Sequence, residues 1–333
     1  MRRGLVVGKF MPLHRGHQLL IDTALAECDD VTVVVYDTHP PGRYPPMPLR
    51  VRTGWLRELY PRLESIVGIE DPLPADESDD PAHAEIYAEQ LAFLGPFRRF
   101  YSSEPTYARF AELIGARHVL VDEARTLVPV SGTAIRDDPY RYRGMISPRV
   151  YSTLVQRVAL VGTESLGKTT LAQALAERLE TRWTHEYGRE LWEAQDLEGS
   201  FADHLRIAVR QREREDAALR HSRSFLFCDT NAWTTLHWSL RSYGWVDDRL
   251  HDLVDRTMGD YVWIVCDDDF GWVRDGTREL AGEAAAAFQQ QQIRDLEARG
   301  VAFHVVSGNV EARVSRVLDI LGVQNQRREP SRA

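Results

Sequence analysis

The stretch Arg157-Val-Ala-Leu-Val-Gly-Thr-Glu-Ser-Leu-Gly-Lys-Thr-Thr170 lies near the middle of the chain and decides its fold. Its apolar start, Val158 to Val161, is typical of a strand buried in a parallel sheet. The G-x4-G-K-T pattern at positions 162–169 is that of a P-loop, whose backbone N–H groups and helix N-terminus bind phosphate oxygens. Leucines at positions 171, 175 and 179 predict the amphipathic helix that must follow. The stretch therefore predicts a nucleotide-binding domain, because an incidental glycine-rich turn requires neither the strand nor the helix.

The polar residues of this loop have expected roles. Lys168 would reach the β- and γ-phosphates of ATP, and the Thr169 hydroxyl would join the shell of a Mg²⁺ ion. A compact ammonium suits this place, whereas a planar arginine fork would change the geometry. Six residues of the loop are expected to bind ATP together with this lysine: Gly162, Glu164, Ser165, Gly167, Thr169 and Thr170.

Two features indicate a second site in front of the P-loop. The chain has only two lysines, Lys9 and Lys168, against 39 arginines, so the second lysine marks another candidate phosphate site. A P-loop also belongs on the first strand of its domain, which leaves about 155 residues in front, enough for a further domain. We predict two α/β domains with doubly wound parallel sheets, over residues 1–155 and 156–325.

The composition fits two α/β cores and disfavours other classes. Of the 333 residues, 43% are hydrophobic and 27% are charged, and the net charge of −9 argues against a general nucleic-acid binder. Cys28, Cys228 and Cys266 form no C-x-x-C pattern, which favours a reducing cytoplasm over a disulfide framework. The apolar run at the N-terminus is too short for a signal peptide, and no segment is long enough to span a membrane. The sequence leaves a homo-oligomer open.

A second strand-loop-helix element begins the chain. The short strand Gly4 to Gly8 leads into Lys9-Phe-Met-Pro-Leu-His-Arg-Gly-His17, and a helix follows. His14 and His17 are three residues apart and Gly16 permits a tight turn, so both imidazoles can face one anion at the helix N-terminus. With Lys9 they would stabilise charge that develops on a phosphoryl group. A metal site is disfavoured, because no carboxylate or third histidine lies nearby.

The run G-K-F-x-P-x-H-x-G-H resembles the signature of the nucleotidylyltransferase superfamily, whose two histidines bind the α- and β-phosphates of ATP. Val130-Ser-Gly-Thr-Ala-Ile-Arg136 looks like the second signature of that superfamily, I-S-x-T-x-x-R, with valine in the first position. Taken alone, it could be a plain capped helix. The resemblance implies that Arg136 is a catalytic cation and that ATP contacts come from Gly8, Phe10, Gly16, Ser131 and Thr133.

Other segments complete the predicted organisation. Further strand segments of the first domain are expected at Val31 to Tyr36, Phe100 to Glu104 and His118 to Asp122. Asp37 to Pro48 is a proline-rich loop that would face the ligand crevice, and Asp71 to Pro81 is an acidic surface loop. In the second domain, a highly charged helix from about Phe201 to His221 is expected to expose its charge to solvent.

Asp229 is the preferred catalytic base of the second domain. It follows the hydrophobic strand Phe225 to Cys228, at a place where P-loop proteins hold a carboxylate beside Mg²⁺ and the attacking hydroxyl. A later strand, Tyr261 to Cys266, precedes a glycine-hinged loop with Arg274 and Arg278. This loop is interpreted as a lid over the phosphates, with a charged surface turn as the alternative.

The order of these parts resembles the bifunctional NadR family over nearly the whole chain. Three stretches, E-Y-G-R-E-L, D-T-N-A-W-T-T and W-V-R-D-G-T-R, are not general P-loop features and select this family. The resemblance implies a Rossmann-like nicotinamide-nucleotide adenylyltransferase domain followed by a P-loop ribosylnicotinamide kinase domain. The kinase would make nicotinamide mononucleotide from the riboside, ATP and Mg²⁺, and the adenylyltransferase would make NAD and pyrophosphate from the mononucleotide and ATP. Some members carry an N-terminal helix-turn-helix module, but the first strand here begins at Gly4, so no nucleic-acid partner is expected.

The resemblance also implies roles for individual residues. The stabilisers of adenylyl transfer would be Lys9, His14, His17 and Arg136. In the kinase half Asp229 would orient the ribose hydroxyl, with Arg274 or Arg278 closing on the phosphates. Glu186 or Arg189 would bind the riboside, and Asp275 is also expected at the substrate. The flat pyridinium cation of the riboside could stack on an aromatic ring, for which the candidates are Tyr187, Trp233 and Trp272; each is equally compatible with core or hinge packing.

Two other interpretations compete with this one. A fused coenzyme A pathway enzyme also joins an H-x-G-H adenylyltransferase to a P-loop kinase, but the E-Y-G-R-E and W-V-R-D-G-T-R stretches argue against it. A nucleotide sensor would bind at one or both sites without turnover. The intact lysines, histidines and Asp229 disfavour the sensor.

Overall fold

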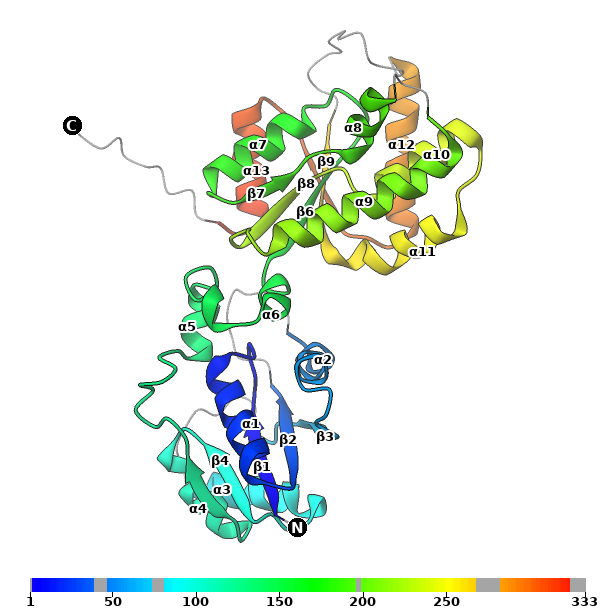
Figure 1. The fold of residues 1–333 in the computed structure, drawn as a ribbon. Coiled ribbons are helices and arrows are strands. Elements are labelled where there is room, and N and C mark those ends of the chain that lie inside the picture. Colours follow the sequence, from blue (N-terminus) through cyan, green and yellow to red (C-terminus); the bar gives the residue numbers. More distant parts are fainter. Residues whose placement is uncertain (1, 39–46, 74–80, 196–198, 268–281, 324–333) are drawn as a thin grey trace, which may run out of the picture. The chain divides into compact units, whose positions relative to one another are not determined.

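The computed structural model describes residues 2–38, 47–73, 81–195, 199–267 and 282–323 (Figure 1). The chain divides into two compact units, Met1–Leu154 and Val155–Ala333, each built around its own five-stranded sheet. Most of the predicted proline-rich loop, most of the acidic loop and the predicted lid residues 272–278 lie outside the described residues. Within the described part of the chain, no helix has the length and apolar character needed to cross a membrane.

Unit 1 is a parallel α/β sandwich with strand order β3-β2-β1-β4-β5. Its strands are β1 (Arg3–Gly8), β2 (Asp30–Asp37), β3 (Ser65–Glu70), β4 (Arg99–Ser102) and β5 (Arg117–Leu120). Its α-helices are α1 (Arg15–Glu27), α2 (Leu49–Leu59), α3 (Pro81–Leu91), α4 (Ala108–Leu113), α5 (Gly132–Asp137) and α6 (Pro148–Ser152), with short 3₁₀ turns at Ala92–Leu94, Pro105–Tyr107 and Arg143–Met145.

Alternation along the strands of unit 1 sends apolar side chains to both faces of the sheet. Leu5, Val34 and Phe100 pack with Leu91 and Phe110, so α3 and α4 cover one face. Their strand neighbours Val6, Val33 and Val35 are fully buried on the opposite face, where α1 and α2 contact the strands. Burial on both faces explains why these strands are almost continuously apolar.

Unit 2 is a second parallel α/β sandwich, with strand order β10-β9-β6-β8-β7. Its strands are β6 (Gln156–Val161), β7 (Arg182–Thr184), β8 (Phe225–Asp229), β9 (Tyr261–Cys266) and β10 (Phe303–Val306). Its α-helices are α7 (Lys168–Arg178), α8 (Tyr187–Ala194), α9 (Phe201–Leu219), α10 (Ala232–Tyr243), α11 (Asp248–Thr257), α12 (Glu283–Ala298) and α13 (Val310–Ile320), with a 3₁₀ turn at Met258–Asp260.

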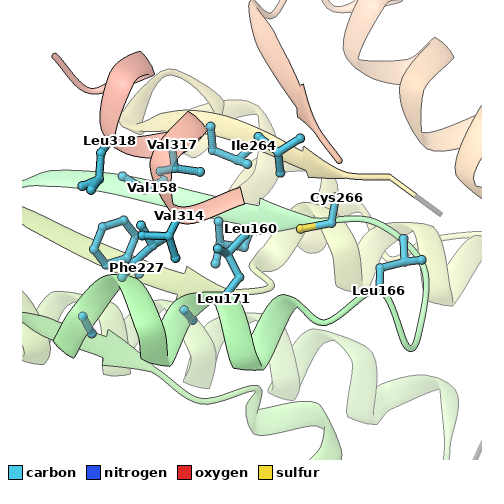
Figure 2. Close-up of a cluster of buried hydrophobic side chains, with 14 residues drawn as sticks. Val158, Leu160, Leu166, Leu171, Phe227, Ile264, Cys266, Val314, Val317 and Leu318 are labelled. Carbon is cyan, nitrogen blue, oxygen red and sulfur yellow. The ribbon is translucent and has the colours of Figure 1, made fainter. Parts of the chain in front are cut away.

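The central strand β6 is buried on both faces. Val158 and Leu160 meet Leu171 of α7 and Val314 and Val317 of α13 in one core cluster (Figure 2). The alternate residues of β6, Ala159 and Val161, belong to a second cluster on the other face, formed with residues of α9 to α12. The two clusters hold the P-loop strand in the middle of the unit.

The predicted fold class is confirmed, because both units are doubly wound parallel α/β sheets and the P-loop follows the central strand β6. Several elements were not predicted: β3, β7, α3, α6, α8, α10, α11 and α12. The strand β7 has only three residues and lies at the edge of its sheet, so it lacks the apolar run that marks a central strand.

The expectation that the charged helix α9 exposes its charge is wrong for one stripe of the helix. Gln211 and Glu215 are buried with Ile207, Ala208 and Leu219. The Glu215 carboxylate accepts a hydrogen bond from the Tyr261 hydroxyl (2.7 Å) and lies 3.5 Å from Arg157 Nε. Partners from the neighbouring strands β6 and β9 therefore permit an ionisable residue to occupy the core.

Candidate nucleotide sites

The P-loop of unit 2 begins where β6 ends, and two of its glycines are required by the backbone. Gly162 has a φ of 131°, and a Cβ there would lie 3.1 Å from the carbonyl oxygen of Cys266. Gly167 has a φ of 73° and is the N-cap residue of α7. Residues with a Cβ rarely adopt such angles. The loop can therefore turn tightly into the N-terminus of α7, where free N–H groups favour an anion.

The predicted lysine and threonines open α7. Lys168 Nζ donates to the Thr163 carbonyl oxygen (2.6 Å), so the ammonium lies across the loop, and Thr169 Oγ1 donates to Asp229 Oδ2 (2.5 Å). The remaining predicted ATP-binding residues of this loop surround the same helix start; they are Gly162, Glu164, Ser165, Gly167 and Thr170.

Asp229 reaches this loop from the neighbouring strand. In the pairing of β6 with β8, Asp229 lies opposite Leu160, which places its carboxylate at the edge where the P-loop starts. The residue is 2% exposed, and its Oδ1 atom has no hydrogen-bond partner among the described residues. A buried carboxylate oxygen without a partner costs free energy, and Mg²⁺ takes oxygen ligands. Thr169 and Asp229 therefore fit the predicted Mg²⁺ ion.

Glu186 belongs to the same site. It is the N-cap residue of α8, and burial raises the pKa of its carboxyl group. The Lys168 ammonium opposes that rise in pKa, whereas the Asp229 carboxylate adds to it. Arg189 Nη2 lies 3.8 Å from Glu186 Oε2. The structure thus brings Glu186 within electrostatic range of Lys168 and Asp229, with Arg189 at its outer side.

The aromatic residues predicted to stack on the substrate differ in their surroundings. Arg214 covers one face of the Tyr187 ring, with its guanidinium carbon 4.6 Å from the ring centre. Trp233 is 1% exposed, donates from Nε1 to Asp295 Oδ2 (2.6 Å) and packs edge to face on Trp263. Trp233 therefore packs in the core of this structure, and its stacking on the substrate stays a prediction. Trp272, Arg274, Asp275 and Arg278 lie outside the described residues.

Two buried residues that the sequence analysis missed hold the P-loop. Gln289 of α12 accepts from the Thr163 hydroxyl (3.3 Å) and donates to the Cys266 carbonyl (3.0 Å). Arg313 of α13 donates to three carbonyl oxygens, those of Leu166 (2.6 Å), Gly308 (2.8 Å) and Asp267 (2.9 Å). These side chains come from the C-terminal part of the sequence and hold the backbone of the loop. No local sequence signal marks them.

In unit 1 the two histidines form the start of α1. His14 is the N-cap residue, and its Nδ1 atom accepts the backbone N–H of Gly16 (3.1 Å). His17 Nδ1 accepts the backbone N–H of His14 (3.4 Å), and the two rings stack with centroids 3.7 Å apart. An imidazole that accepts through Nδ1 carries its proton on Nε2 when neutral. The His14 ring can therefore donate from Nε2 to an anion.

Burial favours the neutral form of both imidazoles in the free protein. Burial, followed by the charge of Arg125, lowers the pKa of His14 to about 4. Burial also lowers the pKa of His17 well below its usual value, with contributions from His14 and Arg125. The cations that line this pocket are therefore Lys9, Arg125 and Arg136, and the imidazoles offer N–H dipoles.

The second predicted signature forms the other wall of the site. Ser131 is the N-cap residue of α5, and its Oγ atom accepts the backbone N–H of Ala134 (3.1 Å). Arg136 donates to the Met11 carbonyl (2.6 Å) and to the Thr133 hydroxyl (3.1 Å). Because Met11 belongs to the first signature, Arg136 joins the two signatures across 125 residues of sequence.

These residues line a pocket of about 300 Å³. Eight of the nine predicted site residues of unit 1 line it: Lys9, Phe10, His14, Gly16, His17, Ser131, Thr133 and Arg136. Gly8 ends the adjacent strand β1. Phe10 is buried and packs its ring on His17, so its side chain supports the histidine.

Arg125 also lines this pocket and was not predicted. Its loop is held by Asp122, whose carboxylate accepts the backbone N–H groups of Thr126, Leu127 and Val128. Both Asp122 and Arg125 have positive φ angles, 52° and 50°. No regular spacing announces this turn, which explains why the sequence did not reveal the arginine.

Comparisons with known proteins agree with this architecture. A family model described as an AAA domain matches residues 157–313. The trifunctional NAD biosynthesis/regulator protein NadR of Salmonella typhimurium is 28% identical over 340 residues, which cover 96% of this chain and 82% of the relative. Two crystal structures of NadR protein, one in complex with NR and one with NAD and AMP-PNP, each match with a TM-score of 0.63. They are 23% and 22% identical and cover 99% of this chain and 98% of theirs, which establishes the fold.

A P-loop on the central strand of one parallel sheet and an H-x-G-H helix start in another define a two-unit nucleotide-binding α/β protein. The similarity over nearly the full chain confirms the resemblance that the motifs predicted. The chain is similar to NadR proteins over nearly its whole length.

Proposed function

We propose that this chain makes NAD from nicotinamide riboside in two ATP-dependent steps. Unit 2 would phosphorylate the riboside to nicotinamide mononucleotide. Unit 1 would then transfer the adenylyl group of a second ATP to the phosphate of the mononucleotide and release pyrophosphate. The observation that carries the proposal is the presence of both phosphate-binding loops in one chain that matches NadR proteins over 96% of its length. NR, NAD and AMP-PNP, the ligands of the NadR structures, suit these two steps.

The kinase step needs a carboxylate, because a neutral ribose hydroxyl must lose a proton when it attacks the γ-phosphate. Asp229 is buried beside the P-loop and would orient that hydroxyl and accept its proton. Thr169 and Asp229 would hold Mg²⁺, which neutralises charge on the β- and γ-phosphates. Lys168 would turn from the Thr163 carbonyl to the phosphates. Glu186 and Arg189 would bind the riboside hydroxyls.

The adenylyl step needs no base, because the attacking phosphate is already an anion. Its barrier lies in the charge that builds up around the α-phosphate and on the pyrophosphate that leaves. His14 supplies an N–H donor, and Lys9, Arg125 and Arg136 supply cations around the same pocket. Transfer of a proton from His14 is unnecessary in this scheme, since the neutral imidazole already donates.

One experiment tests the proposal directly. The purified full-length chain is incubated with ATP, Mg²⁺ and nicotinamide riboside, and the mononucleotide and dinucleotide are separated by chromatography. We expect the mononucleotide to appear first and NAD to follow, with one pyrophosphate released per NAD. A parallel incubation starts from the mononucleotide and measures the second step alone.

Matched substrates separate the competing functions. Phosphopantetheine with ATP should give no product, and its adenylylation would favour a coenzyme A pathway enzyme instead. Tight binding of riboside and mononucleotide without turnover, measured by calorimetry, would favour a nucleotide sensor. The acid analogue, nicotinate riboside, shows how strongly the amide is preferred.

A further inference from the structure

Arg52 of α2 ties three separate segments of unit 1 together. Its guanidinium donates to the carbonyl oxygens of Lys9 (2.7 Å), Tyr36 (2.6 Å) and Met47 (2.8 Å). It also donates to the Asp37 carboxylate (2.9 Å), and its side chain is 0% exposed. Four of the five guanidinium N–H donors are thereby used.

Among the residues that Arg52 contacts, Lys9 is the one that lines the proposed phosphate pocket. Lys9 lies between the end of β1 and Phe10, which has a left-handed φ of 49°. Its carbonyl points inward to Arg52, whereas its side chain is exposed and lines the phosphate pocket. Arg52 does not line that pocket among the described residues, and of the four residues that it contacts only Lys9 does.

Core packing alone does not require an arginine here. Burial of a charge is costly unless it is paired and hydrogen-bonded, and an apolar side chain would fill the same space without that cost. The planar fork of arginine can hold several carbonyl oxygens in fixed directions, which a lysine ammonium cannot do. The residue type thus matches a need to orient backbone carbonyls.

We propose that Arg52 is a positioning residue, which fixes the direction in which the Lys9 ammonium enters the phosphate site by holding the Lys9 carbonyl. The proposal rests on the adenylyl transfer proposed above for unit 1. A displacement of about 1 Å in a group that stabilises the transition state can lower a rate by about 10²-fold. Arg52 should therefore affect kcat more than the binding of either substrate.

The test is a double-mutant cycle in the full chain between Arg52→Lys and Lys9→Ala. Adenylyl transfer from ATP to the mononucleotide is measured for each variant, with KM for both substrates. Arg52→Lys should lower kcat by about 10- to 100-fold and leave both KM values within about threefold. In the Lys9→Ala background the same substitution should have little further effect, because the group it positions is gone.

Two controls separate positioning from folding. Arg50→Lys changes an exposed arginine two residues away on the same helix and should leave kcat unaltered. The kinase half-reaction of unit 2 is measured on the same sample. A fall in this activity would show that intact protein has been lost. If Arg52→Lys fails to fold, Arg52→Gln replaces it in the same double-mutant cycle, because the glutamine amide still donates to carbonyl oxygens.

The outcomes either support or overturn the proposal. An unchanged kcat, or an equal loss of kcat with and without Lys9, would overturn it. A wild-type chain that cannot adenylylate the mononucleotide would refute the proposed function and not this inference. The rate at which an acylating reagent labels Lys9, followed by mass spectrometry, is then compared in the wild-type and Arg52→Lys chains: a changed labelling rate supports positioning, and an equal rate refutes it.

Discussion

Both units place a phosphate loop after their central strand, but the strand beside it differs. In unit 1 the neighbour is β2, which ends at Asp37, and in unit 2 it is β8, which ends at Asp229. Asp37 pairs with the buried Arg52, whereas Asp229 contacts Thr169 of the P-loop and keeps one oxygen without a partner in the described structure. The Asp37 carboxylate therefore forms an ion pair with the structural Arg52, whereas the Asp229 carboxylate has an oxygen available to a ligand.

This difference matches the two proposed reactions. A ribose hydroxyl has a proton to lose, and a phosphate nucleophile has none. An aspartate at the end of a neighbouring strand therefore indicates a base only where no cation already pairs with its carboxylate. Because the two units differ in this way, each serves as a control for the other.

Substitution of these two aspartates should separate the two units most strongly. Asp229→Asn should lower riboside phosphorylation by about 10²–10⁴-fold, because a positioned base is lost. Asp37→Asn should leave adenylyl transfer within a few fold, since the amide oxygen still accepts from Arg52. Steady-state assays of both half-reactions on both variants provide the measurement. Equal losses from the two substitutions would contradict the different roles assigned to the two carboxylates.

The two lysines give the next largest effect. Lys168→Ala should reduce the kinase half-reaction by about 10²–10³-fold and spare adenylyl transfer, and Lys9→Ala should do the reverse. Each ammonium faces a phosphate loop of its own unit, and neither side chain is part of a core cluster. Circular dichroism checks that both variants fold. Loss of both activities from either substitution would rule out independent sites.

The site residues that could be predicted from the sequence are those that belong to a short motif of neighbouring residues. The P-loop, the two histidines, Ser131 and Asp229 stand at strand ends or helix starts, where the pattern of a few neighbours reveals them. Arg52, Gln289 and Arg313 could not be found in this way, because they reach their loops across 43, 126 and 147 residues of sequence. Trp233 shows the same limit: the start of α10 at Asn231 turns its ring into the core, and sequence alone left both orientations open.

Arg313 holds a carbonyl oxygen of the P-loop, as Arg52 holds the carbonyl oxygen of Lys9. Arg313→Lys should leave carbonyl oxygens of Leu166, Gly308 or Asp267 without donors and lower the stability of unit 2 by about 1–3 kcal/mol. Kinase activity should fall about tenfold while adenylyl transfer is retained. Seven of the eight tryptophans lie in unit 2, so urea unfolding followed by fluorescence reports this unit.

The exposed Arg316, one turn further along α13, provides the control for that experiment. Arg316→Lys should change neither the unfolding midpoint nor the kinase rate. If Arg313→Lys behaves like this control, the three carbonyl contacts do not stabilise the loop.

The smallest expected effect is a difference in how pH changes the stability of the two units. Burial raises the pKa of Glu215 in unit 2 to about 7, and burial lowers the pKa of His14 in unit 1 to about 4. Between about pH 4.5 and 7 the folded form of Glu215 holds a proton that the unfolded form releases, so unit 2 loses stability as pH rises. Between about pH 6.5 and 4 the unfolded form of His14 binds a proton that the folded form does not, so unit 1 loses stability as pH falls.

Pulse proteolysis in urea, with peptides assigned by mass spectrometry, measures both units in the intact chain. The free energy of unfolding of each unit should change by at most about 3.5 kcal/mol across its window, from about 1.4 kcal/mol per pKa unit. Glu215→Gln should flatten the slope of unit 2, because the amide still accepts from the Tyr261 hydroxyl but does not titrate, whereas exposed Glu213→Gln on the same helix should not. His14→Asn should reduce the slope of unit 1, since asparagine caps a helix and has no proton to gain, and the buried His17 supplies the part that remains. Slopes of the same sign in both units, or slopes that these substitutions leave unchanged, would show that other groups control the pH dependence.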